Sequence, residues 1–292
     1  MRRTLLLLLL FPLELFSQQL PQFSYPQGAL EAFNPAEYGT QQARVVSAYR
    51  DQWVDFEGSP LTLYNGLSLR IDKDDSNEIS HGVALTHMYD KIGFTDSHFL
   101  KAGYAFRYKM DRSTLGIGAN LGLWRLAIDY TGAIFIDPND PSIPSTKASE
   151  GKLVIDTGVL LRNNDERWHV GLGISSLSAP YFKTLNYDAI PHYWLHGGYS
   201  LNFNSKLKTN FFGIAQSTMV TTQIMVNHTL TIHDLLTIGY GYRYQDAFLG
   251  IVGIDIHGFG IRYIYDHTVS ALQRYSNGSH EIQFSWNINR ES

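Results

Sequence analysis

Several polar residues in this sequence have types and spacings that metal binding would require. The run from Asp72 to Glu78, with the sequence DKDDSNE, resembles the start of a calcium-binding loop. An EF-hand loop, however, needs glycine at its sixth position and glutamate at its twelfth, where this chain has Asn77 and Val83. We therefore interpret the run as a solvated turn between two strands.

Histidine and serine could supply metal ligands or a nucleophile. The 11 histidines are scattered, and no HExxH motif is present. His192 and His196 would share one face of a helix, but in a strand their even spacing only places them on the same side of a sheet. Ser175, Ser176 and Ser178 lie in no nucleophile elbow, which a lipase would need. The residue patterns thus predict no catalytic residue, no metal site and no cofactor.

The composition excludes further classes of protein. Of the 292 residues, 44% are hydrophobic, 13% aromatic and only 17% charged, and there are 25 glycines and no cysteine. Without cysteine, disulfides and thiolate metal sites are excluded. The balance of 23 basic and 27 acidic residues, with no basic block, argues against nucleic acid as a partner. No apolar stretch reaches the roughly 18 residues of a membrane-spanning helix.

The amino terminus has the layout of a secretory signal peptide. Arg2 and Arg3 precede an apolar run from Leu5 to Leu13, and the small residue Ser17 follows. A buried or interfacial helix is the alternative interpretation. We expect residues 1–17 to be a signal peptide cleaved after Ser17, so that the mature chain is exported.

Beyond the signal peptide, apolar and polar residues alternate with the period of two that is typical of strands. In residues 281–288 (EIQFSWNI) every even position is apolar, and in residues 115–123 an aliphatic face alternates with glycine and asparagine. The polar faces contain mainly Gly, Ser, Asn and isolated basic residues, which suits the interior of a barrel. The apolar faces end in Tyr, Phe and Trp, as expected at the two interfaces of a membrane.

We predict an all-β fold, a transmembrane antiparallel β-barrel of about 14 strands in residues 43–292, with residues 18–42 in or under the barrel. Connections after odd-numbered strands are mostly long and those after even-numbered strands mostly short, which places the amino terminus in the periplasm. Closure satisfies the sheet edges that lipid would otherwise leave unpaired. The alternating segments are 43–50, 61–71, 79–89, 99–110, 114–128, 153–162, 167–175, 192–203, 206–215, 220–229, 235–244, 247–253, 256–266 and 279–289.

Charged residues recur on the polar faces of these segments. We expect them to form ion pairs across the lumen that fill the interior, although a lining that selects solutes for a channel is the alternative. The inward residues are Arg107, Lys109, Arg125, Arg162, Arg243, Arg262, Asp129, Asp156, Asp255 and Asp266.

Short ordered motifs run from the first mature residues to the second half of the chain. They are PQFS at 21–24, FNPA at 33–36, YRDQW at 49–53, FEGSP at 56–60, DKIG at 90–93, PHY at 191–193 and GGY at 197–199. Together they resemble the PorP/SprF family of outer-membrane proteins of Bacteroidetes, over essentially the whole mature chain. One departure is Glu37, which stands where the family usually has tyrosine after Asn-Pro-Ala.

The resemblance implies an integral protein of the Gram-negative outer membrane that is a component of the type IX secretion system. Such a component supports secretion or surface attachment of cargo proteins with C-terminal signal domains, including gliding-motility adhesins in some members. The implied partners are outer-membrane lipids, other secretion components and the cargo. The family is not known as enzymes, and the resemblance implies no cofactor.

The motifs also supply a candidate partner-binding or barrel-closing site. Aromatic and arginine side chains dominate binding hot spots, so Trp53 and Phe56 beside Arg50 could anchor the amino-terminal segment or a cargo domain. The alternative is a purely structural motif that plugs or closes the barrel. The candidate residues are Asn34, Pro35, Arg50, Gln52, Trp53, Phe56, Asp90 and Lys91.

Two functions of other classes stay open beside secretion. The first is a passive outer-membrane transporter of small apolar molecules, as found among barrels of this strand number. The second is an outer-membrane lipid enzyme, which we rank last because no serine and histidine can be paired from the sequence.

Overall fold

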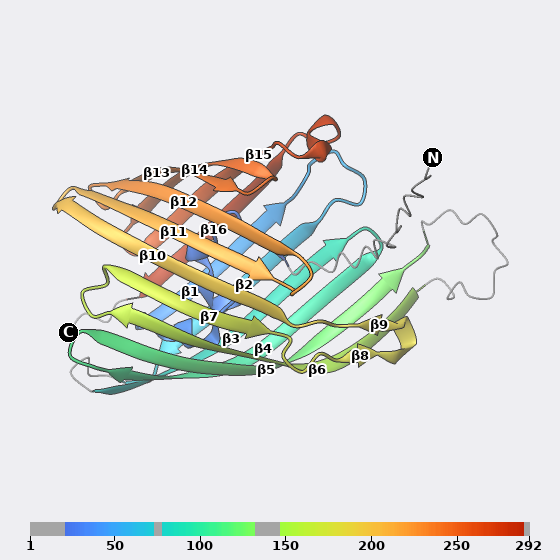
Figure 1. Ribbon diagram of the computed structural model, residues 1–292, viewed down its shortest axis with the longest axis horizontal. Helices are drawn as coiled ribbons and strands as arrows, with labels where there is room; N and C mark the ends of the chain where they lie inside the picture. Colours follow the sequence, from blue (N-terminus) through green and yellow to red (C-terminus); the bar gives the residue numbers. More distant parts are fainter. Residues whose placement is uncertain (1–20, 73–77, 132–146, 289–292) are drawn as a thin grey trace, which may run out of the picture.

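The computed structural model describes residues 21–72, 78–131 and 147–288. Fourteen strands form one closed antiparallel barrel in which each strand pairs with its neighbours and β1 pairs with β16 to close the ring (Figure 1). The strands of the barrel are β1 (Ala43–Asp51), β2 (Leu61–Arg70), β3 (Ile79–Ile92), β4 (Thr95–Lys109), β5 (Ser113–Asp129), β6 (Lys147–Asn163), β7 (Trp168–Ser175), β10 (His192–Asn204), β11 (Leu207–Ser217), β12 (Thr222–Ile232), β13 (Leu236–Arg243), β14 (Ala247–Ile256), β15 (Phe259–Thr268) and β16 (Ser279–Ile288).

The alternation of residue types explains the two faces of the wall. In β16, Ile282, Phe284 and Trp286 are 39–52% exposed and point outward, whereas Glu281 and Gln283 are at most 3% exposed and point into the lumen. Successive side chains of a strand point to opposite faces, so the period of two gives an apolar outer band and a polar lumen. The predicted class and strand number are confirmed.

Several strand boundaries differ from the predicted ones, most clearly those of β3, β4 and β6. β6 begins at Lys147, earlier than predicted, and the connection expected from Asp90 to His98 consists only of Gly93 and Phe94. The predicted strand ends at residue 89, but Asp90 is an inward residue of β3, where its carboxylate accepts a hydrogen bond of 2.6 Å from the Thr62 hydroxyl. Its burial with a partner allows the strand to continue past it.

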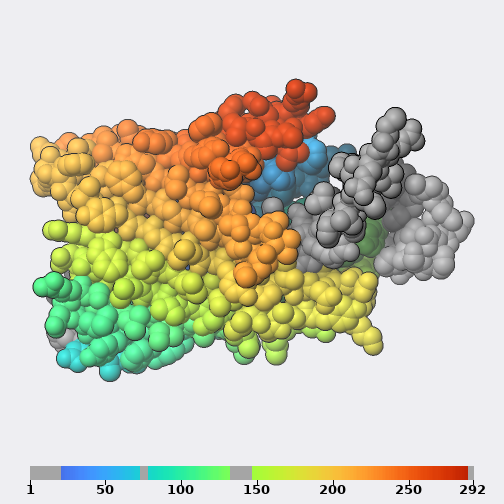
Figure 2. All heavy atoms as spheres, in the orientation of Figure 1, coloured from blue at the N-terminus to red at the C-terminus, as the bar shows by residue number. Residues whose placement is uncertain are grey.

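The two ends of the barrel differ in the length of their connections. The carboxyl end of β16 and the amino end of β1 meet at the end with short turns, where Ala43 pairs with Ile288 (Figure 1). The loop that carries β8 (Tyr181–Phe182), η4 (Lys183–Leu185) and β9 (Tyr187–Asp188) projects at the opposite end, as does the loop with η5 (Ala271–Arg274) (Figure 2). We call these the short-turn end and the long-loop end.

Residues 21–42 lie inside the barrel, and we call them the plug (Figure 1). They form three single-turn 3-10 helices, η1 (Pro26–Gly28), η2 (Leu30–Ala32) and η3 (Pro35–Glu37). The side chain of Asn34 caps η3 by accepting a hydrogen bond of 3.0 Å from the Ala36 N–H, and Pro35 follows at the first helical position. No helix among the described residues is long and apolar enough to cross a membrane.

The hydrophobic core lies between the plug and the wall. Phe23 and Phe33 of the plug are at most 3% exposed and pack with ring centroids 5.8 Å apart. Phe33 also packs on Trp194 of β10 at 4.4 Å, and Tyr64 of β2 closes the other side of Phe23 at 6.1 Å. Aromatic pairs at these separations add to the energy of burial. The barrel is therefore filled by its own amino-terminal segment.

Glycines on the inner face let the plug approach the wall. A Cβ added at Gly118 of β5 would lie under 3.0 Å from the backbone of Pro35, and one at Gly173 of β7 under 3.0 Å from the Phe33 carbonyl oxygen. Real Cβ atoms essentially never come so close. These strand positions thus need glycine because of the plug rather than because of their own backbone conformation.

Gly118→Ala should loosen the plug, because its new methyl group meets backbone that cannot move like a flexible side chain. We expect a loss of about 1–3 kcal/mol in the free energy of unfolding, and faster proteolysis within residues 21–42. The matched control is Gly250→Ala in β14, where a Cβ meets nothing within 4 Å. Urea unfolding followed by tryptophan fluorescence measures both variants, and equal losses would contradict the assignment.

Candidate functional site

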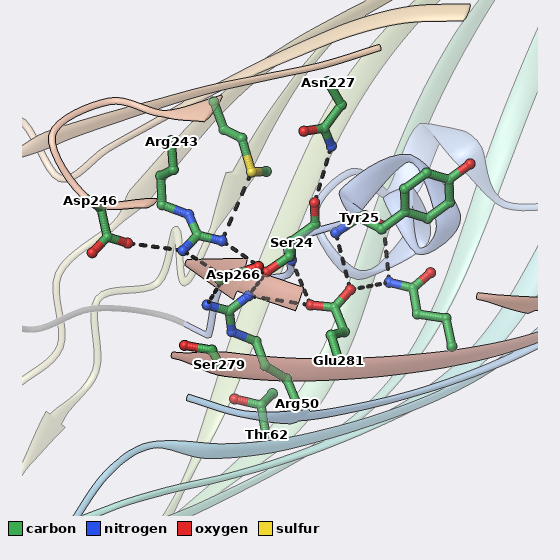
Figure 3. Close-up of polar contacts among 12 residues, drawn as sticks. Ser24, Tyr25, Arg50, Thr62, Asn227, Arg243, Asp246, Asp266, Ser279 and Glu281 are labelled. Atoms are coloured by element: carbon green, nitrogen blue, oxygen red, sulfur yellow. Dashed lines mark hydrogen bonds and ion pairs between the residues drawn. The ribbon is translucent and has the colours of Figure 1, made fainter. Parts of the chain in front are cut away.

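An ion network fixes the first residues of the plug to the wall near the long-loop end (Figure 3). Arg50, near the end of β1, is 1% exposed, and its Nη2 lies 2.9 Å from Asp266 Oδ2 of β15. Its Nη1 lies 3.4 Å from Glu281 Oε2 of β16 and also donates to the Ser24 hydroxyl of the plug. The planar guanidinium therefore joins two wall strands to the plug.

A second arginine completes this network. Arg243 of β13 is 2% exposed and lies 3.1 Å from Asp266 and 2.9 Å from Asp246. Its Nη2 donates to the Ser24 hydroxyl at 3.0 Å. Buried carboxylates are tolerated only when they are paired, so the two arginines allow Asp266 and Glu281 to remain charged in the lumen. We call Ser24, Arg50, Arg243, Asp266 and Glu281 the ion network.

The carboxylate of Glu281 also binds the backbone of the plug. Glu281 accepts hydrogen bonds from the backbone N–H of Ser24 at 2.5 Å and of Tyr25 at 3.0 Å. Gln283, two residues further along β16, donates to the Tyr25 carbonyl at 2.9 Å. Main-chain groups of a segment without regular secondary structure need such partners when they are buried.

Asn34 holds the plug near the middle of the lumen. Its side-chain Nδ2 donates to the Val159 carbonyl at 3.1 Å and lies 3.0 Å from His196 Nε2. Because its Oδ1 accepts from the Ala36 N–H, all the polar atoms of this amide are used. The Asn-Pro pair of the motif therefore both starts η3 and attaches it to β6 and β10.

Two arginines of the wall donate hydrogen bonds to the last plug residues at the short-turn end. Arg107 of β4 donates to the carbonyls of Tyr38 and Gly39, the latter at 2.7 Å. Arg70 of β2 donates to the carbonyls of Gly39 at 3.1 Å and Thr40 at 2.8 Å. Gly39 has φ +66°, the left-handed conformation in which glycine is unstrained, and here the chain turns from the plug toward β1.

Glu37 carries a buried negative charge that is paired with the wall. Its Oε2 lies 2.8 Å from Arg162 Nη2 of β6. Burial alone would raise the pKa of Glu37, but the positive charge of Arg162 keeps this pKa below its usual value. Glu37 also lies beside His169 and His196, and these three side chains are the group among the described residues that could hold a metal ion.

Among the described residues, the lumen contains cavities beside the plug. Two polar cavities of about 410 and 280 Å³ meet at Thr40 and Arg162, toward the short-turn end. Beside Phe33 and Trp194, the two voids lined by both residues measure only about 20 Å³ each. The loop between β7 and β10 adds a cover at the long-loop end, because the buried Phe182 packs on Trp124 at 5.0 Å. What this arrangement does chemically is to bind and hold a peptide segment.

The eight candidate residues do not form a single site. Asn34 and Pro35 lie on the plug, Arg50 lies in the ion network and Asp90 is buried against Thr62. Gln52 and Trp53 are partly exposed at the long-loop end, and Phe56 and Lys91 are exposed there. Arg50 and Trp53 both contact β16, since Arg50 pairs with Glu281 and the Trp53 N–H donates to Ser279 Oγ at 3.0 Å.

The predicted ion pairs in the lumen are partly present. Arg243 pairs with Asp266 and Arg262 with Asp255 at 2.5 Å. Asp156 pairs instead with Lys101 at 2.5 Å, and Arg162 with Glu37. The inward assignment of Arg125 was wrong, because it is exposed on the same face of β5 as Leu121 and Leu123. Asp129 is half-exposed beside Lys147 at the end of that strand.

Sequence reasoning missed Ser24, Glu37, His169 and Glu281 as functional residues. The alternation in β16 could have placed Glu281 inside, since it occupies a polar position between apolar ones. Its partners lie 231 and 257 residues away, and nothing local indicates them. The signal peptide and most of the run from Asp72 to Glu78 lie outside the described residues.

Comparisons with known proteins agree with the barrel. The profile of the family described as type IX secretion system membrane protein PorP/SprF matches residues 15–286. No curated protein matches the sequence. Among solved structures, the Acinetobacter baumannii outer membrane protein Omp33 is similar with a TM-score of 0.50 and 8% identity, covering 85% of this chain and 98% of that one. A Pseudomonas aeruginosa FadL homologue is similar with a TM-score of 0.50 and 10% identity, covering 88% and 93%. At these identities the likeness concerns the fold alone.

Arg50→Met should destabilise the protein by about 3–5 kcal/mol, because it leaves Glu281 buried without its cation and removes one of two cations from Asp266. The control is Lys147→Met, which breaks the exposed pair with Asp129, where the two side chains are 54% and 35% exposed. There we expect a loss below about 1 kcal/mol. Urea unfolding of the detergent-solubilised barrel compares them, and a similar small loss for both would show that the ion network contributes little.

The pair of Glu37 and Arg162 should make part of the stability depend on pH. Because the pKa of Glu37 is lowered by folding, its contribution is complete above about pH 4.5 and is lost as the pH falls through the folded pKa. We expect Glu37→Gln to cost about 1.5–3 kcal/mol at pH 7. Unfolding free energies measured from pH 7 downward should show the two proteins converging below pH 4.5, and a constant difference would refute the assignment.

Proposed function

The chain belongs to the PorP/SprF family of type IX secretion system membrane proteins, and on that premise we propose that it supports secretion or surface attachment of cargo proteins by binding cargo or periplasmic partners. The observation that carries the proposal is the family match, which extends over residues 15–286 and thus over the plug and all but the last two residues of the described barrel. As an outer-membrane component of this secretion system, the protein works where exported cargo crosses to the cell surface. The cargo would include gliding adhesins if this chain resembles the motility-linked members.

The filled lumen favours a role in binding over one in conduction. Phe23 and Phe33 pack between the wall strands, and the two voids beside Phe33 and Trp194 are about 20 Å³ each. A void of this size holds about one water molecule. A passive transporter of small apolar molecules, the alternative function, would need the plug to move before a solute could pass.

The two ends of the barrel offer different surfaces to partners. Because short turns face the periplasm in outer-membrane barrels, we expect the start of β1 and the two polar cavities to lie on that side. The first described residues, by contrast, lie toward the long-loop end, where the Ser24 hydroxyl meets Arg50. Trp53 and Phe56 lie at the long-loop end, where aromatic side chains could bind an exported cargo domain. The apolar outer band would contact the lipids of the outer membrane.

Cargo binding is tested in the native bacterium, from which the gene is deleted and then replaced by variants. Deletion should leave proteins with C-terminal signal domains in the periplasm, and the double variant Trp53→Ala, Phe56→Ala should reproduce most of this defect without reducing the amount of barrel. Tyr244→Ala is the matched control, because it removes an exposed aromatic residue of the same end outside the motif. Fractionation with quantitative mass spectrometry measures the cargo on each side of the membrane.

Physical association is tested by pull-down of the wild-type protein from detergent-solubilised envelopes. Recovery of neither secretion components nor cargo would overturn the proposal. A conductance or liposome-swelling signal from the purified wild-type barrel, together with normal secretion in the deletion strain, would favour the passive transporter instead.

A further inference from the structure

Glu37 of the plug meets two histidines of the wall inside the lumen. It lies in η3, His169 in β7 and His196 in β10, and one ligand atom from each of the three side chains lies within 4.8 Å of the other two. Glu37 and His196 are 3% and 1% exposed, and His169 is partly buried. In the pairing of β7 with β10, Gly171 is opposite His196 and Gly198 opposite His169, so the histidines sit diagonally on the inner face.

Each of these side chains carries a buried polar atom that lacks a hydrogen-bond partner. The atoms are Glu37 Oε1, His169 Nε2 and His196 Nδ1. Leaving one such atom without a partner costs about 1–3 kcal/mol, so three of them on neighbouring side chains favour a group that binds between these residues. A carboxylate oxygen and two imidazole nitrogens are the donor types that zinc takes in proteins.

The wall is shaped to hold the two imidazole rings. A Cβ at Gly171 would lie under 3.0 Å from His196 Nε2, and one at Gly198 would lie under 3.0 Å from His169 Cε1. Each ring thus occupies the space above a glycine of the neighbouring strand, and this fixes both rings before any ligand binds. Preorganised side chains of this kind favour a binding site over a chance cluster.

We propose that Glu37, His169 and His196 bind one divalent transition-metal ion, with zinc the best match, and that this ion ties the plug to β7 and β10. Zinc bonds of 2.0–2.2 Å place tetrahedral ligands about 3.4 Å apart, so ligand atoms that lie within 4.8 Å of one another need to approach by no more than about 1.4 Å. The cavity of about 410 Å³ is lined by Glu37 and His169, which leaves space for a water molecule as the fourth ligand. This inference is independent of the proposed role in secretion.

Asn34 determines which ring nitrogen of His196 carries the proton before the metal binds. Its Nδ2 donates to His196 Nε2 and to the Val159 carbonyl, while its Oδ1 is used by the Ala36 N–H, so the ring proton is on Nδ1. A metal at Nδ1 displaces this proton, and Nε2–H then needs an acceptor where the Asn34 amide presents a donor. Metal binding is therefore coupled to the cap of η3.

Charge also limits the affinity of the natural site. Glu37 Oε2 is held by Arg162, and this leaves only Oε1 for the metal, with a positive charge close by. A carboxylate in place of the Asn34 amide would reverse both limitations, because it adds negative charge and can accept from the Ala36 N–H and from His196 Nε2–H at once. Replacing Asn34 by aspartate is therefore expected to strengthen metal binding, whereas replacing a ligand residue is expected to weaken it.

The test uses the complete mature barrel, purified with a tag that contains no histidine, stripped with EDTA and titrated with Zn²⁺ or Co²⁺. We expect one metal ion per chain by equilibrium dialysis and mass spectrometry, and visible absorption bands of Co²⁺ bound to nitrogen and oxygen. Glu37→Gln, His169→Gln and His196→Gln should each weaken binding by at least about 100-fold. The matched control is His87→Gln, which removes one of the outward pair His87 and His98, whose rings are 5.8 Å apart, and should leave binding unchanged.

Asn34→Asp should bind zinc about 10-fold or more tightly than the wild type, a result that a merely structural role for Asn34 would not give. Three results would overturn the proposal: no stoichiometric binding to the wild type, loss of binding in His87→Gln but not in His196→Gln, or weaker binding in Asn34→Asp. Heat-dependent mobility in electrophoresis shows which variants fold. If the histidine variants do not, the Co²⁺ spectrum of the folded wild type decides, and the absence of its bands overturns the site.

Discussion

The guanidinium of Arg50 between Asp266 and Glu281 is the interaction on which the interior of this barrel depends. A wall that turns its apolar residues toward lipid must turn its polar residues inward, and charges placed there have little water to solvate them. Arg50 and Arg243 compensate the two acids, and the Ser24 hydroxyl and backbone supply the remaining contacts. The plug is therefore not merely contained in the lumen, because its polar groups complete an electrostatic arrangement that the wall leaves unfinished.

The sequence predicts the wall well because the wall follows a local rule. Alternation in EIQFSWNI places Phe284 outside and Glu281 inside without knowledge of any neighbour, and all fourteen strands come from such patterns. The rule ends β3 too early at Asp90, because the sequence does not show that this carboxylate has a buried partner in Thr62. At Arg125 the rule itself holds, because the position shares the outward face of Leu121 and Leu123, and the error was to assume that a charged residue of a strand points inward.

The interior could not be predicted in the same way, because barrel closure determines its contacts. Ser24 meets Glu281 at a separation of 257 residues, and Asn34 meets His196 at 162. Periodicity indicates that these residues face inward, but it does not give the displacement of each strand along its neighbours. This displacement determines which inward residues are in contact. The motifs FNPA and YRDQW were informative for this reason, because they singled out Asn34, Pro35 and Arg50, which all help to hold the plug. Phe56 and Lys91, from two other motifs, lie exposed on the surface.

The register of the closing seam has a consequence for assembly. Arg50 of the first strand and Glu281 of the last are direct partners across β1 and β16, and both bind Ser24. The contact that completes the ring and the contact that seats the plug are thus one event between the two ends of the chain. A barrel that closed without the plug would bring these charges together without the Ser24 groups that bind both of them. Inserting the plug afterwards would require Phe33 to reach its packed position beside Trp194 through a closed wall. This constrains the order of folding, because the amino-terminal segment has to bind the open sheet before β16 pairs with β1. Closure of the barrel therefore requires the complete chain.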